Sequence, residues 1–315
     1  MKHCLIVGAS GDTGVRLAAC LRKRGHRVST TSREAPLDAP DSYRVDPIGE
    51  PNALREVFVS QEQPFDVVVN LVGTWLRDPE RANLGSARAL LPWIEEFEIP
   101  HYMQCSATTV YGDRPGVRLD ESVEPQPDTR IGQILVQLEG ELEGWCTKTG
   151  GSATVLRLPH VYGPERERSL DLMREGRMPV AGTGENIMAH LRVEDLVELI
   201  AAYIELGPAN FRLRNASDGS QATYGAYCDF VRAWDTRTPL PRVSLEDAQA
   251  SRVYSQALGP HFDAEPVLTE FFRYMTASQW IDSSLAWRET GLTPRYPSFQ
   301  VGLPEALGDA ARQSA

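Results

Sequence analysis

The sequence predicts an α/β fold: a Rossmann-type, doubly wound parallel sheet with a smaller C-terminal substrate-binding domain. Strand-like and helix-like segments alternate through the first half of the 315-residue chain, which is the pattern of repeated βα units. A glycine-rich turn at 8–14 separates the first strand from the first helix. The segment FDVVVNL at 65–71 is apolar on both faces, as expected of a strand buried inside a parallel sheet.

Each element follows from its residues in chain order. Short apolar or β-branched runs predict strands at 3–7, 26–31, 65–71, 101–105, 153–158 and 210–214. Apolar residues at helical spacing predict helices at 15–24, 52–59, 82–97, 131–145 and 193–204. After Gly163 and Pro164 the alternation ends, and residues 220–290 mix short helices with loops.

These elements predict two domains. Residues 1–165 are expected to form a dinucleotide-binding Rossmann domain, to which a segment at about 190–216 returns. Residues 166–189 and 217–315 are expected to form the smaller substrate-side domain. No internal repeat or low-complexity linker interrupts this organisation.

Composition and charge exclude several classes of protein. The chain is 42% hydrophobic and 24% charged, a globular balance that excludes disorder, collagen and coiled coil. Its net charge of −11 argues against a sequence-independent nucleic-acid-binding protein. No apolar run approaches the ~20 residues that span a bilayer, and the interrupted N-terminus is no signal peptide. The five scattered cysteines suggest neither a disulfide framework nor a zinc site. We expect a cytoplasmic protein without a membrane segment.

The turn GASGDTG predicts a dinucleotide site. Gly8 permits the tight turn, Gly11 lets the backbone approach a pyrophosphate, and Gly14 allows close packing of the helix. The helix N-terminus then faces the negative phosphates. The strand, turn and helix context is the one that this motif requires, and a plain glycine-rich turn is the alternative.

The end of the second strand predicts which dinucleotide binds. A site for NAD carries an Asp or Glu about 20 residues beyond the glycines, where it binds the ribose 2′-hydroxyl. Here Ser32 and Arg33 occupy that turn. A carboxylate would repel a 2′-phosphate, whereas a hydroxyl and a guanidinium bind it. We therefore predict NADPH as the cofactor, the alternative being that Arg33 is a solvated surface cation.

Several motifs together resemble the extended short-chain dehydrogenase/reductase family, which includes NAD-dependent epimerases and dehydratases of sugar nucleotides. The resemblance covers nearly the whole chain. Besides the turn at 8–14, the matching motifs are NLVG at 70–73, SATTVYGD at 106–113, LRLPHVYGP at 156–164, RVED at 192–195 and the C-terminal GLTPRYPSFQVGLPEAL, with Asp46 and Asn83.

The resemblance implies roles for the matched positions. Asp46 is expected to hydrogen-bond the adenine, Leu71, Val72 and Gly73 to line the ribose, and Pro159 to lie near the nicotinamide carboxamide. A small-molecule substrate and a homodimer, formed through the helices after strands four and five, are also implied. Further cofactor contacts are expected from the glycine-rich turn, at Ser10, Asp12 and Thr13.

The resemblance also identifies what this chain lacks. Family members use a Ser or Thr and a Tyr-x-x-x-Lys pair, whose spacing puts Tyr and Lys on one helical face. The Tyr hydroxyl transfers the proton and the Lys lowers its pKa. Alignment places Ala107, Ile131 and Leu135 at these three positions. No lysine of the chain has a Tyr four residues earlier, so the missing pair does not depend on the alignment.

The helix that carries Ile131 and Leu135 has two compatible interpretations. In one, its apolar side chains simply belong to the core. In the other, they line a pocket for a flat, apolar substrate above the nicotinamide. The stripe consists of Ile131, Ile134, Leu135, Leu138, Leu142 and Trp145.

Four other side chains are candidates for the substrate pocket. Ser106 and Thr108 flank Ala107, but strand alternation points both away from the face that Ala107 occupies. Tyr111 belongs to a motif that families retain for packing. His160, beside the nicotinamide position, is either a hydrogen-bond partner of substrate or cofactor or a structural histidine. Further pocket candidates are Tyr162, Arg192 and Tyr254.

The resulting prediction is an NADPH-dependent ketoreductase without a Tyr acid. Positioned acid–base catalysis is typically worth about 10²–10⁴-fold, and orientation of the reactants can supply more. A ketone flanked by a phenol, as in aromatic polyketides, carries its own hydrogen-bond donor. We therefore predict substrate-assisted reduction of an aromatic natural product. The alternatives are a catalytically inactive NADPH-binding regulator and a non-redox enzyme, such as a cyclase or dehydratase.

Overall fold

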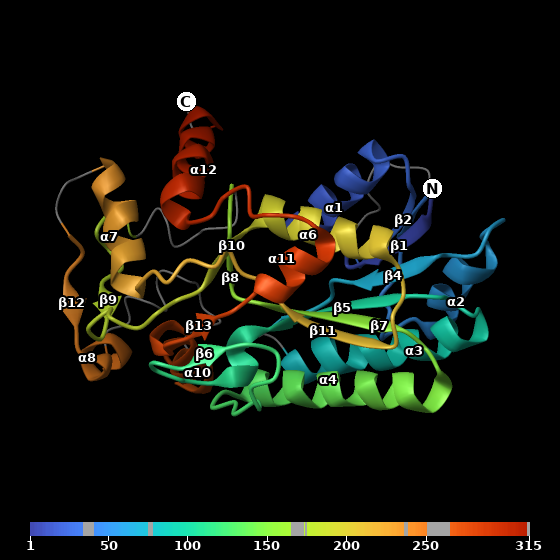
Figure 1. Ribbon diagram of the computed structural model, residues 1–315, viewed down its shortest axis with the longest axis horizontal. Helices are drawn as coiled ribbons and strands as arrows, with labels where there is room; N and C mark the ends of the chain where they lie inside the picture. The colour runs from blue at the N-terminus through green and yellow to red at the C-terminus, as the bar shows by residue number, and fades with distance from the viewer. Residues whose placement is uncertain are drawn as a thin grey trace.

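A central parallel sheet organises the molecule (Figure 1). The computed structural model describes residues 1–33, 41–74, 78–164, 173, 175–235, 239–250 and 265–313. Within them the sheet has seven strands in the order β11-β7-β5-β4-β1-β2-β3, and every neighbouring pair is parallel. The chain starts in the middle and winds outward in both directions, which confirms the predicted doubly wound, Rossmann-type fold.

The strands of this sheet are short and largely apolar. Their bounds are β1 His3–Val7, β2 Arg27–Ser32, β3 Ser42–Arg44, β4 Val67–Asn70, β5 Tyr102–Ala107, β7 Ala153–Leu158 and β11 Phe211–Asn215. Every residue of β1 and β4 is buried, because helices cover both faces of the sheet. The six strands predicted from the sequence are confirmed.

Helices form a layer on each face of the sheet (Figure 1). One layer consists of α1 Asp12–Lys23, α6 Val193–Leu206 and α11 Ser284–Thr290, and it encloses one apolar core. The other consists of α2 Pro51–Val59, α3 Ser86–Glu96 and α4 Arg130–Thr149, and it encloses a second core. The helical faces predicted from apolar spacing are therefore the buried ones.

The helix predicted at 82–97 differs from the expectation at its start. A wider, π-helical turn, η1 (Arg81–Gly85), precedes α3. Within it the Asn83 amide Nδ2 donates to the carbonyls of Thr74 and Pro79, over 2.8 and 2.7 Å. In a regular α-helix the carbonyl of Pro79 would accept from the backbone amide of Asn83, four residues later. Here it accepts from the side chain of Asn83 instead.

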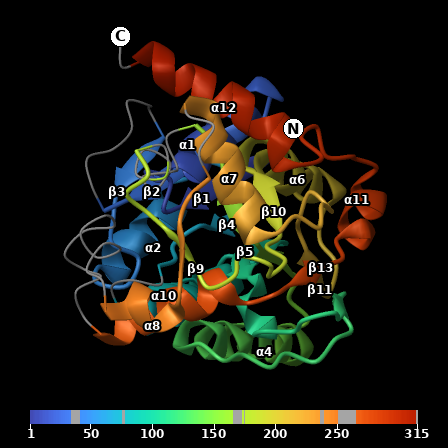
Figure 2. The same ribbon diagram turned by 90° about the vertical axis from the view of Figure 1, so that its left-hand side faces the viewer.

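The remaining described elements build a third apolar core beyond the sheet. Figure 2 shows α7, α8 and α10 in front of the sheet strands. The predicted division of the chain into domains near residues 165 and 217 stays a prediction. The elements are η2 Thr108–Tyr111, β6 Arg118–Leu119, β8 His160–Tyr162, β9 Val180–Ala181, β10 His190–Arg192, α7 Tyr224–Asp235, β12 Arg242–Val243, α8 Leu245–Ala250, α10 Glu265–Thr276, β13 Trp280–Ile281 and α12 Phe299–Gln313.

Candidate cofactor and active site

The carboxyl ends of β1, β2, β4, β5 and β7 meet along one edge of the sheet. Val7 at the end of β1 lies opposite Thr31 on one side and Asn70 on the other, and Ala107 lies opposite Leu158. The winding direction reverses between β1 and β4. Open α/β sheets bind ligands at this edge, next to such a reversal, and the predicted site residues follow these strand ends.

Gly8 and Gly14 have the packing roles that the motif predicts. Gly8 has φ 81°, and a Cβ there would lie 2.9 Å from Cγ2 of Val72. The amides of Gly8 and Ala9 both donate to the carbonyl of Thr31. A Cβ on Gly14 would lie 2.6 Å from Cα of Ala9. The fold itself therefore requires both glycines.

Gly11 differs, because the described residues leave open space around it. Among them, a Cβ added there would meet nothing nearer than the carbonyl oxygen of Gly8, at 3.9 Å. Gly11 is also the N-cap of α1, and no side chain caps the helix there. A helix start of this kind has amides for an anion and a positive partial charge. With exposed Ser10 and half-buried Asp12 and Thr13 beside it, the turn fits a pyrophosphate.

The end of β2 presents the residues predicted to contact a 2′-phosphate. Ser32 is the last residue of β2 and is 5% exposed. Arg33 follows it and is exposed. The neighbouring strand β3 brings a further cation, Arg44, whose Nε donates to the carbonyl of Arg33 over 3.4 Å. The sequence did not indicate Arg44, because only the pairing of β2 with β3 places it there.

Asp46 lies just beyond β3 and carries a stabilised negative charge. Its Oδ1 accepts from the amide of Ile48 over 3.0 Å, and Nη2 of Arg81 is 3.3 Å from its Oδ2. Partial burial acts to raise the pKa of Asp46, but the amides of Ile48 and Gly49 and the Arg81 guanidinium together lower it. An ionised carboxylate suits the predicted contact with the adenine amino group.

The loop after β4 is held in place by two buried amide side chains. The amide of Leu71 donates to the last carbonyl of β1, and that of Val72 donates to Oδ1 of Asn70 over 3.1 Å. A Cβ on Gly73 would lie 2.9 Å from Oδ1 of Asn83. The segment predicted to line the ribose thus has a fixed backbone next to the glycine-rich turn.

The three positions that carry catalytic groups in the family motif hold apolar side chains that belong to, or pack against, one core. Leu135 is a buried member of the core beneath α4, and Ile131 and Ala107 are partly buried against the same core. None of these side chains can donate a proton. The core interpretation therefore holds for Leu135, while the partial exposure of Ile131 and Ala107 leaves the pocket interpretation open for them.

The same face of α4 carries a buried ion pair that the apolar pattern did not indicate. Glu139, one turn after Leu135, accepts from Nη2 of Arg157 on β7 over 2.6 Å, and the two side chains are 7% and 2% exposed. Ser106, predicted as a pocket candidate, donates from Oγ to Oε1 of Glu139 over 2.6 Å. Its hydroxyl is therefore used within the core.

Thr108 and Tyr111 also make their hydrogen bonds to the chain itself. Thr108 lies beyond the end of β5, so the strand alternation assumed for it was wrong. Its Oγ1 donates to Oε1 of Gln279 over 2.8 Å. Tyr111 is fully buried, and its Oη accepts from Nη1 of Arg157 over 2.8 Å. Burial raises the pKa of Tyr111, so it fits the predicted packing role.

His160 lies at the start of β8, directly after buried Pro159. Its amide donates to the carbonyl of Ala189 over 3.2 Å. Its half-buried ring lies edge-on to His190 and to Tyr227, with centroids 5.5 Å away in both cases. His160, which the sequence predicts beside the end of β7, is therefore part of an aromatic cluster with His190 and Tyr227.

Two buried titratable side chains near His160 were not predicted. His190 is completely buried, its ring nitrogens have no hydrogen-bond partner among the described residues, and burial lowers its pKa well below the usual value. Asp218 donates from its amide to the carbonyl of His190, and burial raises the pKa of its carboxyl to about 7. Neither residue stands in a pattern that signals a site, because only tertiary packing brings them together.

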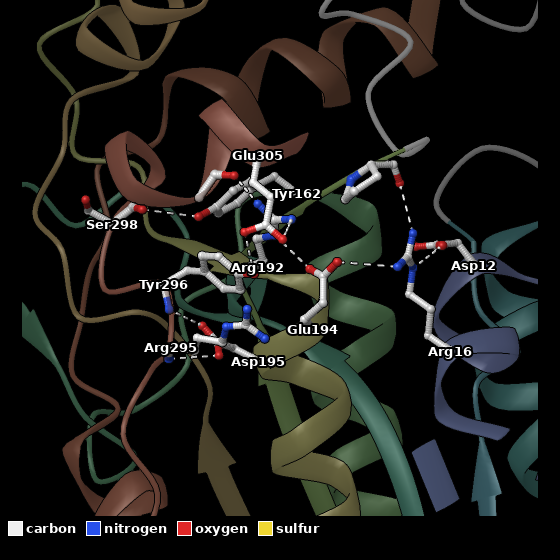
Figure 3. A network of polar contacts seen from close by, with 12 residues as sticks. Asp12, Arg16, Tyr162, Arg192, Glu194, Asp195, Arg295, Tyr296, Ser298 and Glu305 are labelled. Carbon is white, nitrogen blue, oxygen red and sulfur yellow. Dashed lines mark hydrogen bonds and ion pairs between the residues drawn. The ribbon is translucent and has the colours of Figure 1, made fainter. Parts of the chain in front are cut away.

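A polar network joins α1 to the C-terminal segment (Figure 3). Arg16 binds Asp12 over 2.6 Å and Glu194 over 3.3 Å. Glu194 also accepts from Nε of Arg192 over 2.7 Å, and Arg192 donates to the carbonyl of Gly302. The side chain of Arg192 is 1% exposed, so this pocket candidate is used inside the fold.

Two further pocket candidates remain. Tyr162 donates to the carbonyl of Ser298 over 3.3 Å and is fully buried. Tyr254 lies outside the described residues.

The comparison with protein families decides the classification. The sequence profile of the NAD dependent epimerase/dehydratase family matches residues 4–212, a span that runs from β1 into β11 and includes the glycine-rich turn. The chain belongs to this family. The predicted resemblance is therefore confirmed. By sequence, no curated protein matches the chain.

Solved structures of epimerases and dehydratases share the fold of this family member over nearly its whole length. UDP-glucose 4-epimerase from Thermotoga maritima, with UDP-glucose, is 17% identical with a TM-score of 0.76, covering 98% of this chain and 99% of that one. dTDP-glucose 4,6-dehydratase from Bacillus anthracis, in complex with NAD, is 16% identical with a TM-score of 0.78, covering 98% and 96%.

A third similar structure is that of a protein with the phosphorylated cofactor. The human epimerase family protein SDR39U1, with NADPH, is 18% identical with a TM-score of 0.71, covering 96% of this chain and 98% of that one. The chain thus has the NAD(P)-binding fold of the epimerase/dehydratase family. No helix in the described part of the chain is long and apolar enough to cross a membrane.

Proposed function

We propose that this chain is an NADPH-dependent ketoreductase whose substrate supplies the hydrogen bond to its own carbonyl oxygen. One observation supports this above the others. The open space at Gly11 and the uncapped start of α1 are not required by the fold, whereas the three catalytic positions at the same sheet edge are apolar. These observations support a cofactor site beside three catalytic positions whose side chains cannot donate a proton.

The cofactor would be held by residues along the ends of β1 to β4. Gly11 and the start of α1 would take the pyrophosphate, Ser32 and Arg33 the 2′-phosphate, and Asp46 the adenine. When bound, NADPH supplies reducing equivalents as a hydride. The structure of one fold relative, SDR39U1, is with NADPH, which supports the choice of the phosphorylated dinucleotide.

The chain's own contribution at the reacting carbonyl would be orientation and exclusion of water. Ile131 and Ala107 present apolar surface where the family motif has Tyr and Ser or Thr. The nearby hydroxyls of Ser106, Thr108 and Tyr111 are bonded within the core. The negative charge that develops on the carbonyl oxygen must then be stabilised by the substrate. A phenol next to the ketone does this, which favours an aromatic, polyketide-like substrate.

The experiment that tests this proposal is an absorbance assay of NADPH consumption. The panel consists of phenol-flanked quinones and polyketide ketones, their methyl ethers, and ketones without a neighbouring phenol. We expect turnover of the free phenols, because only they carry an internal donor, and loss of turnover on methylation. Undiminished reduction of the methyl ethers would overturn substrate assistance, and conversion without NADPH consumption would indicate a non-redox enzyme.

The second candidate is an NADPH-binding regulator without catalytic activity. The same observation on Ser106, Thr108 and Tyr111 favours it, because a protein that never transfers a proton has no use for a donor at this edge. Its expected behaviour is tight NADPH binding without turnover of any ketone in the panel. The affinity for its partner would then change with cofactor, which a pull-down with and without NADPH measures.

A further inference from the structure

Two arginines lie at the paired ends of β2 and β3. Arg44 is the last residue of β3, and Arg33 directly follows β2. Ser32 pairs in register with Arg44, and the amide of Val45 continues the pairing by donating to the carbonyl of Ser32 over 2.8 Å. Residues in register on parallel strands project to the same face of the sheet. The pair two positions earlier, Thr30 and Ser42, shows this directly, because Oγ1 of Thr30 donates to Oγ of Ser42 over 3.0 Å.

The position of Arg44 is fixed by the turn that carries Arg33. Nε of Arg44 donates to the carbonyl oxygen of Arg33 over 3.4 Å. This bond uses one of the five N–H donors of the guanidinium. The terminal nitrogens of Arg44 are therefore held at the turn after β2, next to a second exposed arginine.

The charges of these two arginines are not balanced within the described residues. No carboxylate in that part of the chain lies within 4.0 Å of either guanidinium, whereas Arg27 at the other end of β2 pairs with Asp41 over 3.3 Å. Arg81 is likewise paired, with Asp46 over 3.3 Å. Like charges on neighbouring segments repel each other, and an anion bound beside them would relieve that repulsion.

We propose that Arg44 is a second ligand of the cofactor 2′-phosphate and sets, with Arg33, the preference for NADPH over NADH. This inference rests on the proposed use of NADPH. A dinucleotide in this fold places its adenosine ribose at the end of β2. A 2′-phosphate there is dianionic with three acceptor oxygens, which is more than one guanidinium satisfies. Arg33 supplies one guanidinium from the turn and Arg44 supplies another from the neighbouring strand.

The test measures binding rather than turnover. The probes are 2′,5′-ADP and 5′-AMP, which differ only by the 2′-phosphate, titrated by calorimetry into the wild type and into Arg44→Ala, Arg33→Ala and Arg44→Lys. We expect Arg44→Ala to weaken 2′,5′-ADP about tenfold to a hundredfold, the usual effect of losing a hydrogen bond to a charged group. Binding of 5′-AMP is expected to stay unchanged. Arg44→Lys should recover part of the loss, because it keeps the charge without the planar fork.

Arg55→Ala is the matched control, because this arginine lies on α2 and pairs with Glu96 over 2.6 Å. It should leave both probes unaffected. Unchanged binding of 2′,5′-ADP by Arg44→Ala, with a loss in Arg33→Ala, would overturn the inference and leave the proposed NADPH preference standing. Equal losses of both probes in Arg44→Ala would also overturn it, because they indicate a structural role. Equal affinity of the wild type for the two probes would instead overturn the NADPH preference itself.

Discussion

The two halves of one sheet edge use their polar side chains in opposite ways. At the ends of β1 and β2, Gly11 leaves room that the fold does not need, and exposed arginines stand without carboxylate partners among the described residues. At the ends of β5 and β7, nearby hydroxyls are bonded inside the core and the catalytic positions are apolar. The residues of the first half fit the cofactor that we propose, whereas packing accounts for those of the second.

This contrast indicates how a ligand-binding site can be distinguished from a catalytic site in a fold of this kind. A site that still serves a ligand shows features that cost stability or leave charge unpaired, because selection for the ligand maintains them. A site that has lost its catalytic groups closes around an ordinary core. The predictions below test each half by asking whether stability or binding responds to a substitution.

The largest expected effect concerns the buried ion pair in the catalytic half. Glu139→Ala leaves the Arg157 guanidinium buried without its carboxylate, which costs about 3–5 kcal/mol of unfolding free energy. The control is Glu141→Ala on the same helix, whose partner Arg88 is 51% exposed, so its loss should cost about 1 kcal/mol or less. Urea unfolding followed by circular dichroism measures both. Equal losses of unfolding free energy in the two variants would mean that the pair of Glu139 and Arg157 does not stabilise this core more than a surface ion pair does.

The next effect concerns the glycine-rich turn. Gly11→Val should weaken NADPH binding about a hundredfold, because the side chain fills the space meant for phosphate and blocks charge-assisted bonds. Thermal stability should stay close to that of the wild type. Gly14→Val should instead lower stability, since its Cβ meets Ala9 at 2.6 Å. Fluorescence titration and thermal melts separate the two. A loss of stability in Gly11→Val would contradict the claim that the fold does not need this glycine.

A smaller gain is expected from restoring an acid. Ile131→Tyr places a phenol at the position that holds Tyr in the family motif. Turnover of ketones without a neighbouring phenol should rise by about a hundredfold, the lower end of the range for positioned acid catalysis. Ile131→Phe has the same ring without the hydroxyl and should give no gain. Similar rates for both variants would show that the hydroxyl does not reach the reacting carbonyl.

The last effect concerns Asp218 and pH. Burial raises the pKa of this carboxyl from its ordinary value of 3.8 to about 7. Between these values the folded protein binds more protons than the unfolded chain, so this group makes stability fall as pH rises from about 4 to about 7. Asp218→Asn keeps an acceptor for the amide of Ser220 and should reduce that fall, measured by urea unfolding at pH 5 and pH 8.

The same variant also tests the comparison itself. Ketone turnover by Asp218→Asn should match that of the wild type, because we assign the hydrogen bond to the substrate. Abolished turnover with intact folding would make Asp218 the proton source. The half of the sheet edge at the ends of β5 and β7 would then contribute a catalytic group.

Local patterns were enough to predict the framework and the conformation of the glycine-rich turn. The apolar runs of β1 and β4 and the glycine-rich turn each fix their own conformation, so neighbouring residues in sequence carry the information. Arg44 was missed because only strand pairing brings it to Arg33. The ion pair of Glu139 and Arg157 was not predicted, because a glutamate within an amphipathic helix is expected to face solvent. Only the position of Arg157 on β7 shows that Glu139 is buried.

The network in Figure 3 ties the first helix of the sheet to the last helix of the chain. Arg192 is almost wholly enclosed and holds both Glu194, the partner of Arg16, and the backbone of Gly302 in α12. A Cβ at Gly302 would lie 2.1 Å from Oη of Tyr162, so α12 packs closely against β8. Separating α12 from this site would leave the buried guanidinium of Arg192 without one of its partners, and the network therefore opposes the detachment of α12.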